Sequence, residues 1–206
     1  MIVIRAILCG FLLLSVPVAF ANDLDKGLQA AEIGNYAVAL DKLQPLATQG
    51  NAVAQVALGM MYFNGYGVTK DYAVASKWYR KSADQGNASA QYNLGLLYTL
   101  GQGVPQDYAE ALQRLHKAAY QGSADAKFSL GEMYASGDGV PQDSAEALKW
   151  YRKAVGLGSM LAHNKLAQMY HEGNGVPQDD VKAYALWDVS ETIDNSDGNP
   201  AMDNRL

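Results

Sequence analysis

The stretch Ala54-Gln-Val-Ala-Leu-Gly-Met-Met-Tyr62 decides the fold, because the chain repeats it in fixed register. Further copies begin at Ala90, Ala126 and Ala162, so each starts 36 residues after the previous one with no insertion. A fixed period of about 20 to 50 residues is the signature of a repeat architecture, in which neighbouring units stack on one another. The later copies read Ala90-Gln-Tyr-Asn-Leu-Gly-Leu-Leu-Tyr98, Ala126-Lys-Phe-Ser-Leu-Gly-Glu-Met-Tyr134 and Ala162-His-Asn-Lys-Leu-Ala-Gln-Met-Tyr170.

The repeated stretch itself predicts a first helix in each unit. Leu58, Met61 and Tyr62 follow Ala54 at helical spacing and form one apolar stripe. Gly59 lies inside this helix, where a glycine costs about 1 kcal/mol relative to alanine. We therefore expect a neighbouring helix to approach so closely that there is no room for a larger side chain. The equivalent positions hold Gly95, Gly131 and Ala167.

A loop and a second helix follow in every unit. The Gly65-Tyr66-Gly67 segment is expected to end the first helix, because glycine readily adopts the left-handed conformation of a helix cap. Val68 is expected to pack back onto the core, and Asp71 suits the N-cap of a second helix that stops near Gly86. In the next two repeats the Asp and a Glu three residues later resemble capping boxes: Asp107 with Glu110, and Asp143 with Glu146.

Stacked helix pairs of this kind form an all-α structure. One pair cannot bury both of its faces, whereas a row of antiparallel pairs buries a continuous core, so the sequence predicts an α/α solenoid. The expected units are a signal peptide (1–21), an N-terminal capping helix pair (22–51), four repeats (52–87, 88–123, 124–159 and 160–193) and a C-terminal tail or incomplete capping helix (194–206).

The N-terminal segment has the three regions of a secretory signal peptide. Arg5 is its only charge, residues 7–18 are mostly apolar, and Ala19-Phe20-Ala21 fits a cleavage site after Ala21. The alternative is an uncleaved membrane anchor, but the apolar run is short for a span of about 20 residues and contains Pro17. We expect a periplasmic or secreted protein with no membrane insertion after cleavage.

Composition excludes several classes of function. A formal net charge of −5 and a pI of about 5.1 argue against non-specific nucleic-acid binding, which needs a basic surface. With one cysteine, Cys9, a disulfide framework and a Cys-based zinc site are excluded. His163 and His171 are eight residues apart, which does not match metalloprotease spacing, so we expect the histidines at the surface or an edge. No cofactor or metal is predicted.

The pattern A-x-x-L-G-x-M-Y…G-x-G-V-x-x-D…A…W-Y-x-K-A over residues 52 to about 190 resembles Sel1-like repeats, a family related to tetratricopeptide repeats. Departures are local: Arg114 stands where Trp78 and Trp150 place an aromatic ring, and Leu186-Trp187 shifts the aromatic in the last copy. The resemblance implies a non-enzymatic adaptor that binds a protein or a cell-wall component. For a bacterial member, the resemblance implies one of three roles: neutralising a toxin as an immunity protein, interacting with a host, or signalling in the envelope.

Comparison between copies locates a candidate binding surface. The residues at positions 54, 58, 61 and 62 barely change between repeats. The residues equivalent to Val56, Met60 and Phe63 differ from repeat to repeat, and these three positions share one helix face. Residues that repeat packing does not fix are available for a partner, or they form ordinary solvated surface with some core. The candidate partner-binding residues are Tyr92, Phe128, Glu132, Gln168 and His171.

Two other functions stay open at this stage. A hydrolase of cell-wall or β-lactam substrates would need clustered titratable groups, and the sequence holds no Ser-x-x-Lys, Ser-Asp-Asn or Lys-Thr-Gly motif. A self-assembling scaffold would oligomerise through the C-terminal end, where the repeat pattern fades and no polar cap is evident.

Overall fold

The structure is a computed structural model that describes the backbone of residues 18–196 and the side chains of residues 22–189. The predicted signal peptide therefore lies outside the residues with described side chains, and α1 begins at Val18, before the predicted cleavage site. Of the predicted C-terminal segment, only the backbone of 194–196 is described, as the end of α10.

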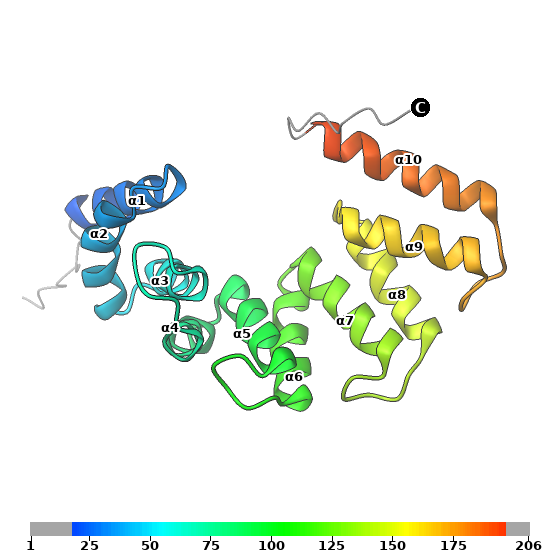
Figure 1. Cartoon of the computed structure of the whole chain (residues 1–206), viewed down its shortest axis with the longest axis horizontal. Coiled ribbons are helices and arrows are strands. Elements are labelled where there is room, and N and C mark those ends of the chain that lie inside the picture. Colours follow the sequence, from blue (N-terminus) through cyan, green and yellow to red (C-terminus); the bar gives the residue numbers. More distant parts are fainter. Residues whose placement is uncertain (1–17, 197–206) are drawn as a thin grey trace, which may run out of the picture.

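The described part of the chain contains ten α-helices and no strand, which confirms the predicted all-α solenoid. Each helix packs mainly against the helices before and after it in the chain. The pairs wind into an arc, with α3, α5 and α7 toward its inner side and α4 and α6 on its outer side (Figure 1). The helices are α1 (Val18–Glu32), α2 (Tyr36–Thr48), α3 (Ala52–Asn64), α4 (Tyr72–Asp84), α5 (Ala88–Leu100), α6 (Tyr108–Tyr120), α7 (Ala124–Ser136), α8 (Ser144–Val155), α9 (Met160–Glu172) and α10 (Asp180–Ser196).

The first helix of every repeat is closed at both ends by local chemistry. The side chain of Asn51 caps α3 by accepting a hydrogen bond from the N–H of Ala54 at 2.9 Å. At the other end Gly65 adopts φ of 81° and its N–H bonds to Met61, as a left-handed cap requires. Val68 packs against the N-terminal core cluster. The helix ends therefore fall where the sequence predicted them.

The second helices begin at the predicted aspartates, but only one of the two hydrogen bonds of each predicted capping box forms. Asp107 Oδ1 accepts from the N–H of Ala109 and of Glu110, at 3.0 and 3.1 Å. Its own N–H donates to the carbonyl of Tyr98, because the loop folds back along the preceding helix. No donor is left for Glu110, which pairs instead with Arg114. In the same way the N–H of Asp143 donates to the Tyr134 carbonyl, and Glu146 pairs with Lys149.

Close packing of the two helices in each repeat explains the glycines. A Cβ atom on Gly59 would lie 2.5 Å from Cε1 of Tyr79, a ring that is 1% exposed. A Cβ atom on Gly131 would meet Tyr151 at the same distance, and one on Gly95 would lie 2.9 Å from Leu115. The sequence-based explanation of these glycines is therefore confirmed.

Buried glutamines connect successive repeats. Gln91 is 4% exposed; its Nε2 donates to the Ala83 carbonyl at 3.3 Å, and its Oε1 accepts from Gln121 at 2.8 Å. Gln55 makes the same two contacts one repeat earlier, with Ala47 and Gln85. Because buried polar groups are costly without partners, these bonds fix the register of one repeat on the next.

Candidate functional site

A hollow of about 490 Å³ lies between α7, α9 and α10, toward the C-terminal end of the arc. Three of the five predicted binding residues line it, one from α7 and two from α9. Its apolar side chains come from all three helices, so the hollow exists only when consecutive repeats are stacked. The lining residues are Phe128, Leu161, Asn164, Lys165, Gln168, His171, Glu172 and Trp187.

Glu132, the fourth predicted residue, lies beside this hollow in a fixed position. Its Oε1 accepts a short hydrogen bond from the Tyr151 hydroxyl, and its Oε2 lies 3.4 Å from Lys165 Nζ. Burial raises the pKa of Tyr151, and the hydrogen bond to Glu132 raises it further, so the phenol stays a donor. Lys165 of the hollow is thereby joined through Glu132 to the core of the preceding repeat.

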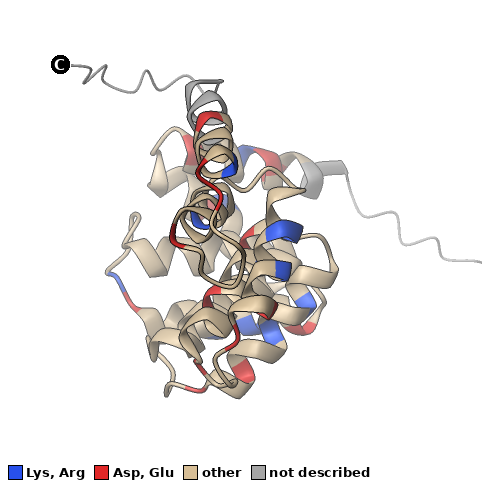
Figure 2. Ribbon diagram, turned by 90° about the vertical axis from the view of Figure 1, so that its right-hand side faces the viewer, with Lys and Arg blue, Asp and Glu red and all other residues tan. Residues whose placement is uncertain are grey.

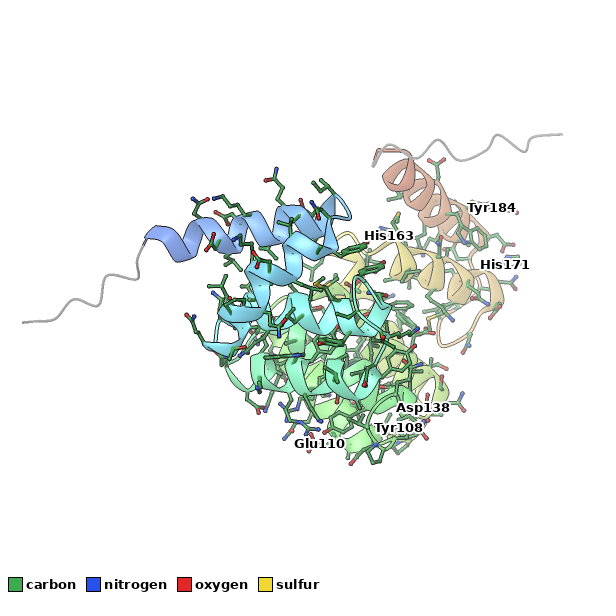
Figure 3. All side chains as sticks on the ribbon, turned by 60° about the vertical axis from the view of Figure 1, so that its left-hand side comes forward. Tyr108, Glu110, Asp138, His163, His171 and Tyr184 are labelled. Atoms are coloured by element: carbon green, nitrogen blue, oxygen red, sulfur yellow. The ribbon has the colours of Figure 1, made fainter. Side chains whose placement is uncertain are left out.

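His171 joins the end of α9 to the start of α10. Its Nδ1 lies 2.8 Å from Asp180 Oδ1, and its ring centroid is 5.9 Å from that of Trp187. The imidazole remains 53% exposed, so it stays accessible at the rim. Figure 3 shows His171 near the end of α9, with Tyr184 on the adjacent α10. Beside it, Gln168 Nε2 donates to Glu172 at 2.7 Å.

Tyr92, the fifth predicted residue, lies in a different hollow. This one measures about 560 Å³ and is formed by α3, α5 and the turn into α7, with Val56, Met60 and Asp125 among its lining residues. Burial raises the pKa of Tyr92, and the negative charge of Asp125 adds to this effect. The predicted residues therefore occupy two hollows rather than one continuous site, and equivalent lining residues of the two, such as Ser89 and Leu161, are two repeats apart.

Sequence reasoning missed several lining residues. Leu161 is 58% exposed although it is a large apolar residue, and its equivalents Val53, Ser89 and Asp125 differ in chemistry. That variability was the available signal. Trp187 was recognised only as a displaced aromatic, because nothing in the sequence shows that α10 turns this ring toward the hollow.

The histidines only partly follow the expectation of a surface or edge position. His163 is 6% exposed and its Nδ1 lies 2.8 Å from the Ser159 carbonyl, which corrects that prediction. It occupies the place of the buried Gln55 and Gln91, so an interior polar position was mistaken for an edge. His116 is half-buried, with its ring 5.3 Å from Trp150.

The described residues form neither a candidate metal site nor a membrane-spanning helix. Within residues 22–189, no three His, Cys, Asp or Glu side chains are grouped so that they could hold a metal ion. In the same part of the chain, no helix combines the length and apolar character needed to cross a membrane.

The family follows from the repeats. The profile described as Sel1 repeat matches residues 52–87, 88–123, 124–159 and 161–188. The chain belongs to the Sel1 repeat family. No protein of curated function is significantly similar to the sequence.

Solved structures of bacterial Sel1 repeat proteins resemble the chain over most of its length. A protective antigen of uropathogenic Escherichia coli is 37% identical with a TM-score of 0.76; the alignment covers 84% of this chain but only 38% of the antigen. A Sel1 repeat protein of Oxalobacter formigenes is 35% identical with a TM-score of 0.77, and 82% of this chain and 69% of that protein are covered. One from Klebsiella pneumoniae shares the fold at 24% identity and a TM-score of 0.60, over 87% and 89% of the two chains.

Proposed function

We propose that this Sel1 repeat protein is a non-enzymatic adaptor that binds a protein partner in the hollow between α7, α9 and α10. The observation that carries the proposal is the placement of side chains that vary between repeats. Phe128, Gln168 and His171 occupy positions whose residue type changes from repeat to repeat, and they line one hollow. Function is argued from this site and not from the fold, because a solenoid by itself does not specify a partner.

The chemistry of the hollow indicates what it accepts. Phe128, Leu161 and Trp187 supply apolar surface, whereas Lys165 and Glu172 place opposite charges at the rim. An apolar pocket with a few polar groups around it suits one large apolar side chain of a partner, flanked by polar groups that hydrogen-bond to the rim. This arrangement favours a protein ligand over a small charged metabolite.

We place the adaptor in the bacterial envelope or outside the cell. The signal-peptide pattern of residues 1–21 supports export. The related E. coli protein is described as a protective antigen, which is compatible with an exported protein. Toxin neutralisation and host interaction are two roles that the same surface would serve with different partners.

Exposed residues give the cleanest test of the hollow. Tyr92 and Phe128 pack in core clusters, so their replacement would lower stability as well as binding. Leu161 and Gln168 are exposed, and the double variant Leu161→Ala/Gln168→Ala is expected to lose the partner captured from an envelope fraction while keeping its helicity. Leu100→Ala is the matched control, because Leu100 is 60% exposed at the far end of α5.

Three results would reject the proposal: unchanged capture by the folded double variant, equal loss in the Leu100→Ala control, or turnover of peptidoglycan or a β-lactam by the wild-type protein. The last result would instead favour the hydrolase hypothesis. Circular dichroism of each variant is measured first, so that loss of binding is not confused with loss of fold.

A further inference from the structure

The second helices of the three central repeats carry an excess of positive charge on an acidic protein. Eight of the 16 Lys and Arg residues of the chain lie in α4, α6 and α8, against three acidic residues there, Asp84, Glu110 and Glu146. These three helices therefore carry a net charge of about +5, whereas the whole chain has −5. In Figure 2 the blue segments gather toward the right-hand side of the molecule.

The basic residues share one helix face. On α4 they lie at spacings of three and four residues, which places them side by side on a helix. The third position of the set is a lysine in all three helices, so the basic face continues from one repeat to the next. We call this set the basic row: Lys77, Arg80, Lys81, Lys117, Lys149, Arg152 and Lys153, all of them exposed.

Few carboxylates neutralise the basic row. Asp84 and Glu110 both pair with the half-buried Arg114, which is not part of the row, and Glu146 pairs with Lys149. Among the described residues, Lys77, Lys81, Lys117 and Lys153 have no carboxylate oxygen within 4 Å. Their positive charge is therefore available to a partner.

The row is limited at both ends by acidic residues. The helix before it, α2, has Asp41 where α4 has Lys77, and the helix after it, α10, has Asp188 where α8 has Arg152. The basic face thus covers three consecutive second helices and no more. A basic surface of limited length suits a short acidic segment better than a long polyanion.

A hollow of about 470 Å³ interrupts the charges on α4. Val74 and Trp78 supply apolar surface, Lys77, Arg80 and Lys81 surround it, and Asp84, which pairs with Arg114, also lines it. Lys81 Nζ lies 4.5 Å from the centroid of the Trp78 ring, and Lys153 Nζ lies 3.9 Å from that of Trp150. Farther along the row, Tyr120 on α6 is 83% exposed. The surface therefore offers apolar contacts between its cations.

We propose that the basic row binds an acidic polypeptide segment of a partner protein, at a surface separate from the inner hollows. Carboxylates of the segment would pair with the unneutralised lysines, and an apolar side chain would enter the hollow beside Trp78.

Two other anionic partners fit less well. Proteins bind single-stranded nucleic acids by stacking the bases on open aromatic faces, but lysines lie over the rings of Trp78 and Trp150, so of the three rings only Tyr120 is largely exposed. A flat bilayer would touch only part of the row, because α4 and α6 lie on the convex side of the arc (Figure 1). An extended peptide, in contrast, can follow a convex surface from helix to helix.

The test uses the full chain and a short labelled peptide of alternating Glu and Ala with one Leu, beside the same peptide with Gln in place of Glu. We expect only the Glu peptide to bind. Its affinity should fall as salt is added, because at physiological ionic strength charges more than about 8 to 10 Å apart are screened from one another. Removing four cations of the row is expected to weaken binding by about tenfold or more. The row variant is Lys77→Gln, Lys81→Gln, Lys117→Gln and Lys153→Gln.

A control variant loses the same number of lysines elsewhere: Lys26→Gln, Lys42→Gln, Lys70→Gln and Lys127→Gln. It is expected to bind the Glu peptide with less than about threefold change. No binding of the Glu peptide, or equal loss in both variants, would overturn the proposal. Tighter row-dependent binding of anionic phosphatidylglycerol vesicles or of a DNA oligonucleotide would replace it with a membrane or nucleic-acid partner. Row-dependent self-association at low salt would replace it with a second copy of this chain.

The outcome is independent of the proposed adaptor site. The row variant leaves Leu161 and Gln168 intact, so capture of a partner by the inner hollow is expected to persist when peptide binding is lost.

Discussion

Replacing Gly59 by alanine tests the physical reason for the repeat's internal glycine. Alanine favours the helix by about 1 kcal/mol. Its Cβ, however, would lie 2.5 Å from Tyr79 Cε1 and 2.6 Å from Cδ1, against 3.4 Å or more for ordinary contacts. The ring must therefore retreat by about 0.9 Å although it is 1% exposed. Overpacking of this kind costs about 1 to 3 kcal/mol, so after the gain in helix propensity the net loss of stability is expected to reach up to about 2 kcal/mol.

The chain contains a matched control for this change. Gly95→Ala gains the same helix propensity, but its neighbour is Leu115, 2.9 Å away, and a branched aliphatic chain shifts more easily than a buried phenol ring. We expect its free energy of unfolding to change by less than about 1 kcal/mol. In the background Tyr79→Leu, which reproduces the second repeat, Gly59→Ala is expected to become nearly neutral.

Urea denaturation followed by circular dichroism measures the three differences, with the double variant analysed as a thermodynamic cycle. If Gly59→Ala stabilises the protein as much as Gly95→Ala does, or if the Tyr79→Leu background leaves its cost unchanged, contact with the ring does not explain the glycine.

Three further predictions concern single polar groups. Burial, and then the charge of Lys153, lower the pKa of His116 below 6.5, so the unfolded chain takes up this proton first as the pH falls. The stability of the wild type should therefore decline below about pH 6.5 more steeply than that of His116→Gln; parallel pH profiles of urea midpoints would contradict this. Glu132→Leu removes the acceptor of the buried Tyr151 hydroxyl and should lower the free energy of unfolding by about 1 to 3 kcal/mol. Glu132→Gln keeps an acceptor and should cost less than about 1 kcal/mol. Equal loss of stability by both variants in thermal denaturation would refute the role of that bond. Gln91→Leu should cost about 1 to 3 kcal/mol, because the Ala83 carbonyl and the Gln121 amide both lose a partner, and unchanged hydrogen exchange across that repeat boundary would refute its role in register.

Much of the candidate surface could be predicted, because comparing the repeats of one chain distinguishes positions that packing fixes from positions that vary. Positions that stacking requires keep their residue types, so the variable stripe of Tyr92 and Phe128 was visible without coordinates. The stripe did not show that these two rings lie in separate hollows, or that Lys165 reaches Glu132. Those are contacts between helices of different repeats, and no local pattern encodes their distance.

The predictions for the capping boxes and for His163 differ from the structure for the same reason. The spacing of Asp107 and Glu110 fits a capping box, yet the preceding helix supplies the Tyr98 carbonyl as a competing acceptor. The spacing of His163 and His171 predicted a surface or edge position, yet His163 is buried between helices. In both cases the outcome depends on a neighbour that the local sequence does not name.

The sequence by itself determined the period, the helix ends and the all-α solenoid, because helix formation and capping depend on residues within a few positions of one another. Only the tertiary structure decided which variable residues meet, where the hollows open and how the basic row continues across three helices. These features arise from the way one repeat packs on the next, and packing depends on the shapes of side chains that are far apart in the chain.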